Sequence, residues 1–60
     1  MNVIEKLMET GLTRTEAKIS LEELKLDIAK ATASNKYYEI DNIIKAKGLS
    51  PDCYFDIIFA

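Results

Sequence analysis

The side chains that most often carry chemistry are scarce in this chain. Its 60 residues include no histidine and a single cysteine, Cys53. Serine–histidine and cysteine–histidine nucleophiles and histidine-ligated metals therefore cannot form within one chain. A cysteine near the start of a helix gains some thiolate character, but a free cysteine usually behaves as a small buried hydrophobe. We predict no metal, no cofactor and a structural role for Cys53.

Carboxylate groups remain as candidates for general acid–base chemistry. Glu22 and Glu23 stand close to Asp27, and Asp52 precedes Asp56 by four residues. Acid–base work requires a carboxyl group whose pKa is shifted inside a pocket. Acids at this spacing are ordinary on the solvated face of a helix, and a chain this short leaves little room for a buried cleft. We predict that the protein is not an enzyme and has no catalytic residues.

The basic side chains give little support to nucleic-acid binding. The sequence carries eight Lys+Arg against ten Asp+Glu, a net charge of −2. Arg14, Lys18 and Lys25 alternate with acids, so no strip of a single sign forms. Nucleic-acid modules usually carry a basic patch. A small dimeric DNA-binding transcriptional regulator is therefore kept as the alternative function, and nucleic acid is not the expected partner.

Glycine, proline and one polar pair divide the chain into four segments that must position these side chains. In residues 2–10 the apolar positions share one helix face, with Asn2 suited to cap the start and Gly11 to end the helix. In the next segment Thr13 and Glu16 form a capping box, the strongest local signal in the chain. No glycine or proline follows until Gly48, so this helix is predicted over residues 14–33.

The predicted long helix carries two apolar stripes. One repeats at steps of four and three, which is typical of a helix-packing seam; its members are Ala17, Leu21, Leu24, Ile28 and Ala31. Ile19, Leu26 and Ala33 fall on the opposite side, at 100° per residue. A surface helix needs one such stripe, so the second predicts a further contact.

The last two segments are also predicted as helices. Residues 36–47 place Tyr37 and three isoleucines on one face, leave Tyr38 off it, and end at Gly48 in a Schellman-type turn. Ser50 and Pro51 are a good helix start, although the aromatic and isoleucine content of residues 51–60 is also compatible with a terminal strand. No other segment resembles a strand that could pair with it, so we favour a helix.

Together these segments predict one all-α domain over residues 1–60. It is a small helical bundle built on an antiparallel helical hairpin, residues 14–33 against 36–47, with short N- and C-terminal helices. The size relations give a folded surface of roughly 4,000 Å². Burial of apolar surface then stabilises the fold by roughly 90 kcal/mol, and ordering of the chain costs roughly 90 kcal/mol. A single copy therefore gains little net stability. We expect further burial against another subunit or protein.

That further burial predicts an interface with a partner or in a homodimer. The first helix is too short to reach Leu26 and Ala33, and the C-terminal segment is apolar around most of its circumference. Large exposed apolar patches mark association sites. The predicted interface residues are Ile19, Leu26, Ala33, Tyr38, Tyr54, Phe55, Ile58 and Phe59.

The chain is similar in size and character, though not in any motif, to the small acidic helical proteins that phages and other mobile elements use to block a host protein. We therefore predict a non-enzymatic, homodimeric protein-binding module that blocks or modulates a larger, unidentified protein. The start of the chain lacks a signal-peptide pattern, and no stretch approaches the ~20 apolar residues of a membrane span. We expect a cytoplasmic protein.

Overall fold

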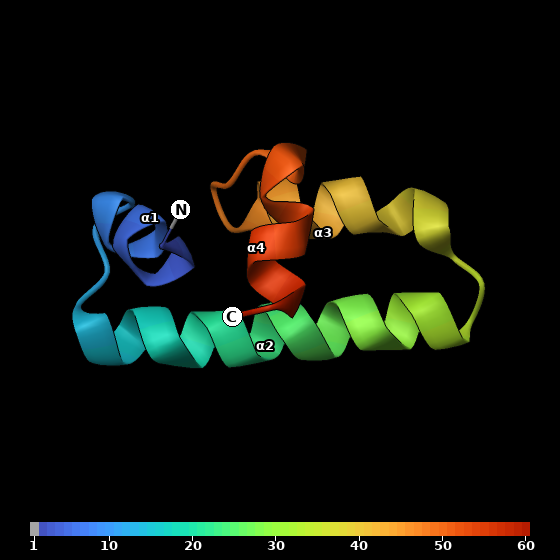
Figure 1. Cartoon of the computed structure of the whole chain (residues 1–60), viewed down its shortest axis with the longest axis horizontal. Helices are drawn as coiled ribbons and strands as arrows, with labels where there is room; N and C mark the ends of the chain where they lie inside the picture. The colour runs from blue at the N-terminus through green and yellow to red at the C-terminus, as the bar shows by residue number, and fades with distance from the viewer. Residues whose placement is uncertain (1) are drawn as a thin grey trace.

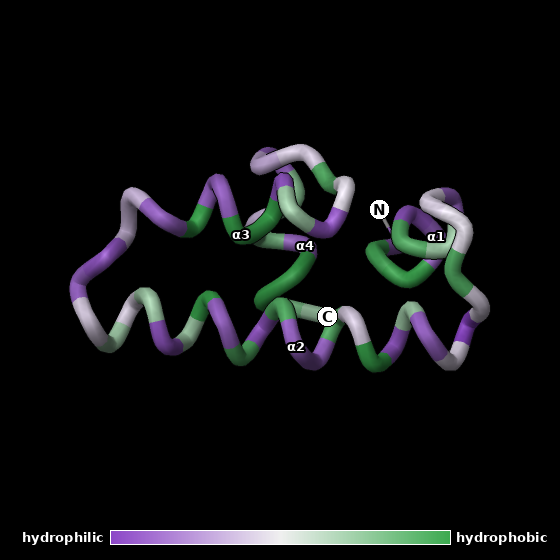
Figure 2. The backbone as a smooth tube through the Cα atoms, turned by 180° about the vertical axis from the view of Figure 1, so that it is seen from behind, coloured by the Kyte–Doolittle hydropathy of each residue, from purple (hydrophilic) through white to green (hydrophobic). Residues whose placement is uncertain are grey.

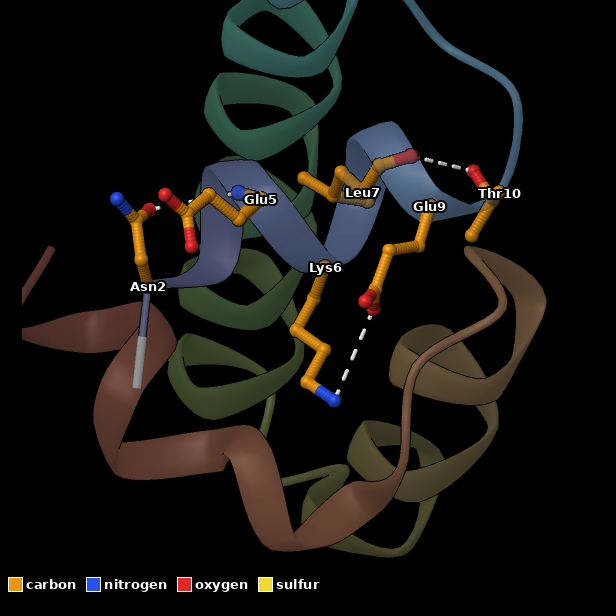
Figure 3. A network of polar contacts seen from close by, with 6 residues as sticks. All are labelled: Asn2, Glu5, Lys6, Leu7, Glu9 and Thr10. Carbon is orange, nitrogen blue, oxygen red and sulfur yellow. Dashed lines mark hydrogen bonds and ion pairs between the residues drawn. The ribbon is translucent and has the colours of Figure 1, made fainter.

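Side chains of the flanking residues cap both ends of the first helix. The computed structural model describes residues 2–60, and its first helix is α1 (Val3–Glu9). Asn2 Oδ1 accepts a hydrogen bond from the amide of Ile4 at 2.9 Å. At the other end the Thr10 hydroxyl donates to the Leu7 carbonyl at 2.6 Å, a contact drawn in Figure 3. The cap predicted at Asn2 is therefore present.

The long helix α2 (Arg14–Ala33) has the predicted bounds. The Thr13 amide donates to the Glu16 carboxylate at 2.9 Å, and the Glu16 amide donates to the Thr13 hydroxyl oxygen at 3.2 Å. The helix ends at Ala33, with Ser34 as its C-cap, and the chain then turns at Asn35. Asn35 adopts a φ of +58°, in the left-handed region that asparagine tolerates better than most residues. The capping box and the end of α2 are thus set by local sequence.

The third helix differs from the prediction of one helix over residues 36–47. Tyr37–Glu39 form a 3-10 turn, η1, and α3 spans Ile40–Ala46. Lys36 provides no side-chain oxygen to cap the first amides. The first turn therefore tightens, with the Glu39 amide donating to the Lys36 carbonyl at 2.9 Å. Tyr37, predicted on the apolar face, is instead exposed to solvent.

The end of α3 follows the predicted Schellman-type turn. Gly48 adopts a φ of +80°, and the Leu49 amide donates to the Ile44 carbonyl at 3.4 Å. Leu49 is buried beside the core. A left-handed residue at this position lets the chain fold back and bury an apolar side chain against the last turn.

The C-terminal segment is helical, which decides between the helix and the strand in favour of the helix. Ser50 Oγ accepts a hydrogen bond from the Asp52 amide at 3.3 Å. Pro51–Cys53 then form a second 3-10 turn, η2, which leads into α4 (Tyr54–Ile58). The predicted start is present, while the α-helical part is one short stretch of five residues.

The tertiary arrangement places α2 as a base with the other helices on one side of it (Figure 1). α1 lies over the N-terminal part of α2, and α3 runs back along the C-terminal part in the opposite direction. α4 descends toward the middle of α2, between them in this view. The all-α fold is confirmed, and α3 runs in the direction opposite to α2 (Figure 1).

The core fills the space on the inner side of α2. It takes one stripe from that helix, two buried positions each from α1 and α3, one from α4, and two from the segment between α3 and α4. These residues are Val3, Leu7, Ala17, Leu21, Leu24, Ile28, Ala31, Ile40, Ile44, Leu49, Cys53 and Ile57. Along α2 the hydropathy alternates between apolar and polar residues (Figure 2). The accessible surface of the structure is 4044 Å², in line with the sequence-based value.

Candidate functional site

The residues first considered for chemistry lie in structural or solvated positions. Glu22, Glu23 and Asp27 are exposed on α2, and Asp52 is exposed at η2. Asp56 is half-buried in α4. Within residues 2–60, no three His, Cys, Asp or Glu side chains are grouped so that they could hold a metal ion. The carboxylates of α2 therefore belong to a charged outer surface.

One carboxyl group has a shifted pKa, and its cause is local. The Thr13 amide, and next the Thr13 hydroxyl, lower the pKa of Glu16 by hydrogen-bonding its carboxylate. Glu16 is fully exposed at the start of α2, where the helix dipole also favours a negative charge. This shift belongs to helix capping and marks no pocket.

Cys53 is a buried free thiol that forms part of the wall of an open cleft. The cleft has a volume of about 650 Å³ and lies between the end of α1 and the segment that leads into α4. Its rim includes Lys6 and Glu9, whose charged groups approach to 3.7 Å (Figure 3). The cleft is lined by both polar and apolar groups, and its polar side chains include Ser50, Asp52 and Asp56.

The eight predicted interface residues separate into three places. Ile19, Leu26 and Ala33 lie on the outer face of α2, with Ile19 57% and Leu26 56% exposed. α1 packs over the N-terminal part of α2 (Figure 1), and Ile19 remains exposed. Tyr38 lies in η1 and is also exposed. The remaining four belong to α4 or follow it.

The α4 surface consists of Tyr54, Phe55, Ile58 and Phe59. Phe55 is 66% and Phe59 81% exposed, and their rings stack with centroids 6.3 Å apart and planes at 12°. Tyr54 packs edge-on against Phe55 at 5.3 Å. Tyr54 and Ile58 are half-buried, because they turn toward α2.

A groove runs between the α4 surface and the side of α2. Its volume is about 440 Å³ and its lining is mainly apolar. The lining residues are Lys25, Ile28, Ala29, Thr32, Ala33, Tyr54 and Ile58. At one end the Lys25 ammonium donates to the Ala60 carbonyl oxygen at 2.8 Å. The groove thus joins the outer face of α2 to the α4 surface through Ala33.

The exposure of Tyr37 and the α2 side of the groove could not be predicted from the sequence. A continuous helix from residue 36 would place Tyr37 on the apolar face, but the 3-10 turn at Tyr37–Glu39 leaves it exposed. Ala29 and Thr32 have no apolar periodicity that marks them, and they become groove residues only because α4 packs across this part of α2. Their small side chains leave the space that forms the groove.

Comparison with models of protein families, with curated proteins and with solved structures finds no match for this chain. None of the helices formed by residues 2–60 combines the length and apolar character required to cross a membrane.

Proposed function

We propose that the chain is a non-enzymatic protein-binding module that acts as a homodimer and blocks or modulates a larger protein. The observation that supports it is the α4 surface, where Phe55 and Phe59 are stacked on one another yet largely open to solvent. Phenylalanines in such positions add nothing to the core of a single copy.

The physical basis is the apolar area that a partner would remove from water. At 66% and 81% exposure, the two rings together offer on the order of 300 Å² if each side chain has about 200 Å². Burying that area is worth roughly 7 kcal/mol before the costs of association are subtracted. The rings are already stacked, so little side-chain freedom remains to be lost on binding.

The groove beside the α4 surface gives such a partner a place for its own apolar side chain. Tyr54 and Ile58 form one wall, and the side of α2 forms the other. Stacked aromatic anchors next to a groove are the arrangement expected of interface hot spots. The binding surface of a chain this small would act by covering a site on its partner, as the inhibitors of phages and mobile elements do in the cytoplasm.

The proposal is tested by capture of the partner with matched variants. Tagged wild-type chain, Phe55→Ala, Phe59→Ala and Tyr37→Ala are used against a lysate of the native host. Tyr37 is the control, because it is an exposed aromatic residue outside the α4 surface. We expect one protein to be retained by wild type and Tyr37→Ala and lost with both phenylalanine variants.

Measurement with the purified partner then gives the energy of each anchor. Truncation of either phenylalanine should weaken binding by about 2 kcal/mol or more. Equal capture by all four chains would contradict the assignment of the α4 surface. Duplex DNA is the comparison ligand, since tight binding that falls steeply with salt would favour the transcriptional regulator instead.

A further inference from the structure

The outer face of α2 carries an apolar row that is symmetric about its central residue. Ile19 stands seven residues before Leu26, and Ala33 stands seven residues after it. At 1.5 Å per residue these positions lie about 10.5 Å to either side of Leu26. The helices α1, α3 and α4 are all on the opposite side of α2 (Figure 1). We propose that two copies pack antiparallel through this face, around a two-fold axis at Leu26.

The side-chain sizes suit that pairing. A two-fold axis at Leu26 places each Leu26 against its equivalent and each Ile19 against the partner's Ala33. A large side chain then meets a small one at both ends of the contact, which allows the two helices to approach closely. The face is thus complementary to itself, as a two-fold interface requires.

The flanking charges agree with the antiparallel direction. At 100° per residue, Glu23 and Lys30 lie on the same flank, about 60° and about 40° from Leu26. Glu23 is about 4.5 Å before Leu26 along the axis and Lys30 about 6 Å after it. Rotation about the two-fold axis leaves each residue on the same flank of the contact but reverses its position along the helix axis. Glu23 and the partner's Lys30 therefore lie within about 1.5 Å of each other along the helix axis. The symmetry forms this pair twice.

A parallel pair of the same helices would place like charges together. Glu22 lies on the other flank, about 40° from Leu26 and about 6 Å before it. In a parallel dimer, the flank that carries Glu23 would meet the flank of the partner that carries Glu22. Glu23 would then face the partner's Glu22 at nearly the same position along the helix axis, and the symmetry would form this pair twice. Like charges across a contact are unfavourable. The charge pattern therefore selects the antiparallel arrangement.

The contact is small, which sets the strength to be expected. α2 is about 30 Å long, and one helix pair falls below the roughly 1,200 Å² of a standard interface. We expect a weak, concentration-dependent dimer. This inference specifies the homodimer within the proposed function, but it leaves Phe55 and Phe59 free, so the two surfaces can be tested separately.

Cysteine cross-linking tests the direction of the pair. In a Cys53→Ala background, Ile19→Cys and Ala33→Cys chains are oxidised separately and as a mixture. We expect the mixture to give a disulfide between positions 19 and 33, and Ile19→Cys alone to give no more dimer than a Tyr37→Cys control outside the face. Efficient pairing of Ile19→Cys with itself would indicate the parallel dimer and overturn the proposal.

Sedimentation equilibrium of the isolated protein tests the charges. Glu23→Lys or Lys30→Glu should each weaken the dimer by about tenfold, and the double variant should recover it. Lys45→Glu is the control, since it makes the same charge change as Lys30→Glu but on α3. Leu26→Glu should give a folded monomer, because this side chain already faces solvent in one copy. Wild type that remains monomeric at millimolar concentration, or a double variant as weak as the singles, would refute the proposal.

Discussion

Replacement of Ile57 by alanine should detach α4 and remove much of the stability of the fold. Ile57 has no exposed surface and is the fully buried side chain that α4 contributes to the core. The substitution deletes three carbon atoms, about 2.4 kcal/mol at about 0.8 kcal/mol each. The cavity left behind adds to this, for a total of about 2–5 kcal/mol. A chain of this length has roughly 3–9 kcal/mol of stability.

Urea unfolding followed by far-ultraviolet circular dichroism measures the loss. Phe59→Ala is the matched control, because Phe59 follows the same helix but is 81% exposed. It should change stability by less than about 0.5 kcal/mol. A loss below about 1 kcal/mol for Ile57→Ala would mean that α4 is not anchored by this residue, and the reasoning that fixes the α4 surface in place would be refuted.

Three further predictions concern the helix ends. Gly48→Ala should lower stability by about 1–2 kcal/mol, seen in the urea midpoint, because its φ is +80° and a Cβ would stand 3.1 Å from Thr10 Cγ2; an unchanged midpoint would contradict it. Asn35→Gly should raise the melting temperature slightly and Asn35→Ala should lower it, since φ is +58° there. The lowered pKa of Glu16 means that its carboxylate stabilises the fold above pH 4.5, the ordinary value, and that this contribution disappears as the pH falls through the lowered pKa. The advantage of wild type over Glu16→Gln should therefore be present at neutral pH and absent in acid, and an advantage that persists in acid would be inconsistent with the capping role.

The parts of the structure that were predictable are those governed by neighbouring residues. Thr13 and Glu16 set the start of α2, and Gly48 sets the end of α3, because each acts within one helical turn. The wrong prediction for Tyr37 also concerned a local feature, the start of a helix. The helix start at Lys36 has no capping side chain and forms a tighter first turn, and Tyr37, predicted on the apolar face, is exposed there.

The candidate surfaces depended on sequence and packing to different degrees. The outer stripe of α2 could be predicted, because two apolar stripes on opposite sides of one helix cannot both face the same core. The groove could not, because it requires knowledge of where α4 crosses α2. Periodicity within a helix says which residues share a face, but not which distant segment lies over that face.

Sequence alone determined the helical character of this protein, the bounds of its long helix and its surplus of apolar side chains, because caps, breakers and periodicity act over a few residues. Tertiary structure decided how that surplus was divided. Ile57 took the core position of α4, which left Phe55 and Phe59 outside, and all other helices packed on one side of α2, which left Leu26 in water. These outcomes follow from the packing of segments remote in the chain, where shape and volume select one arrangement among many that the local patterns allow.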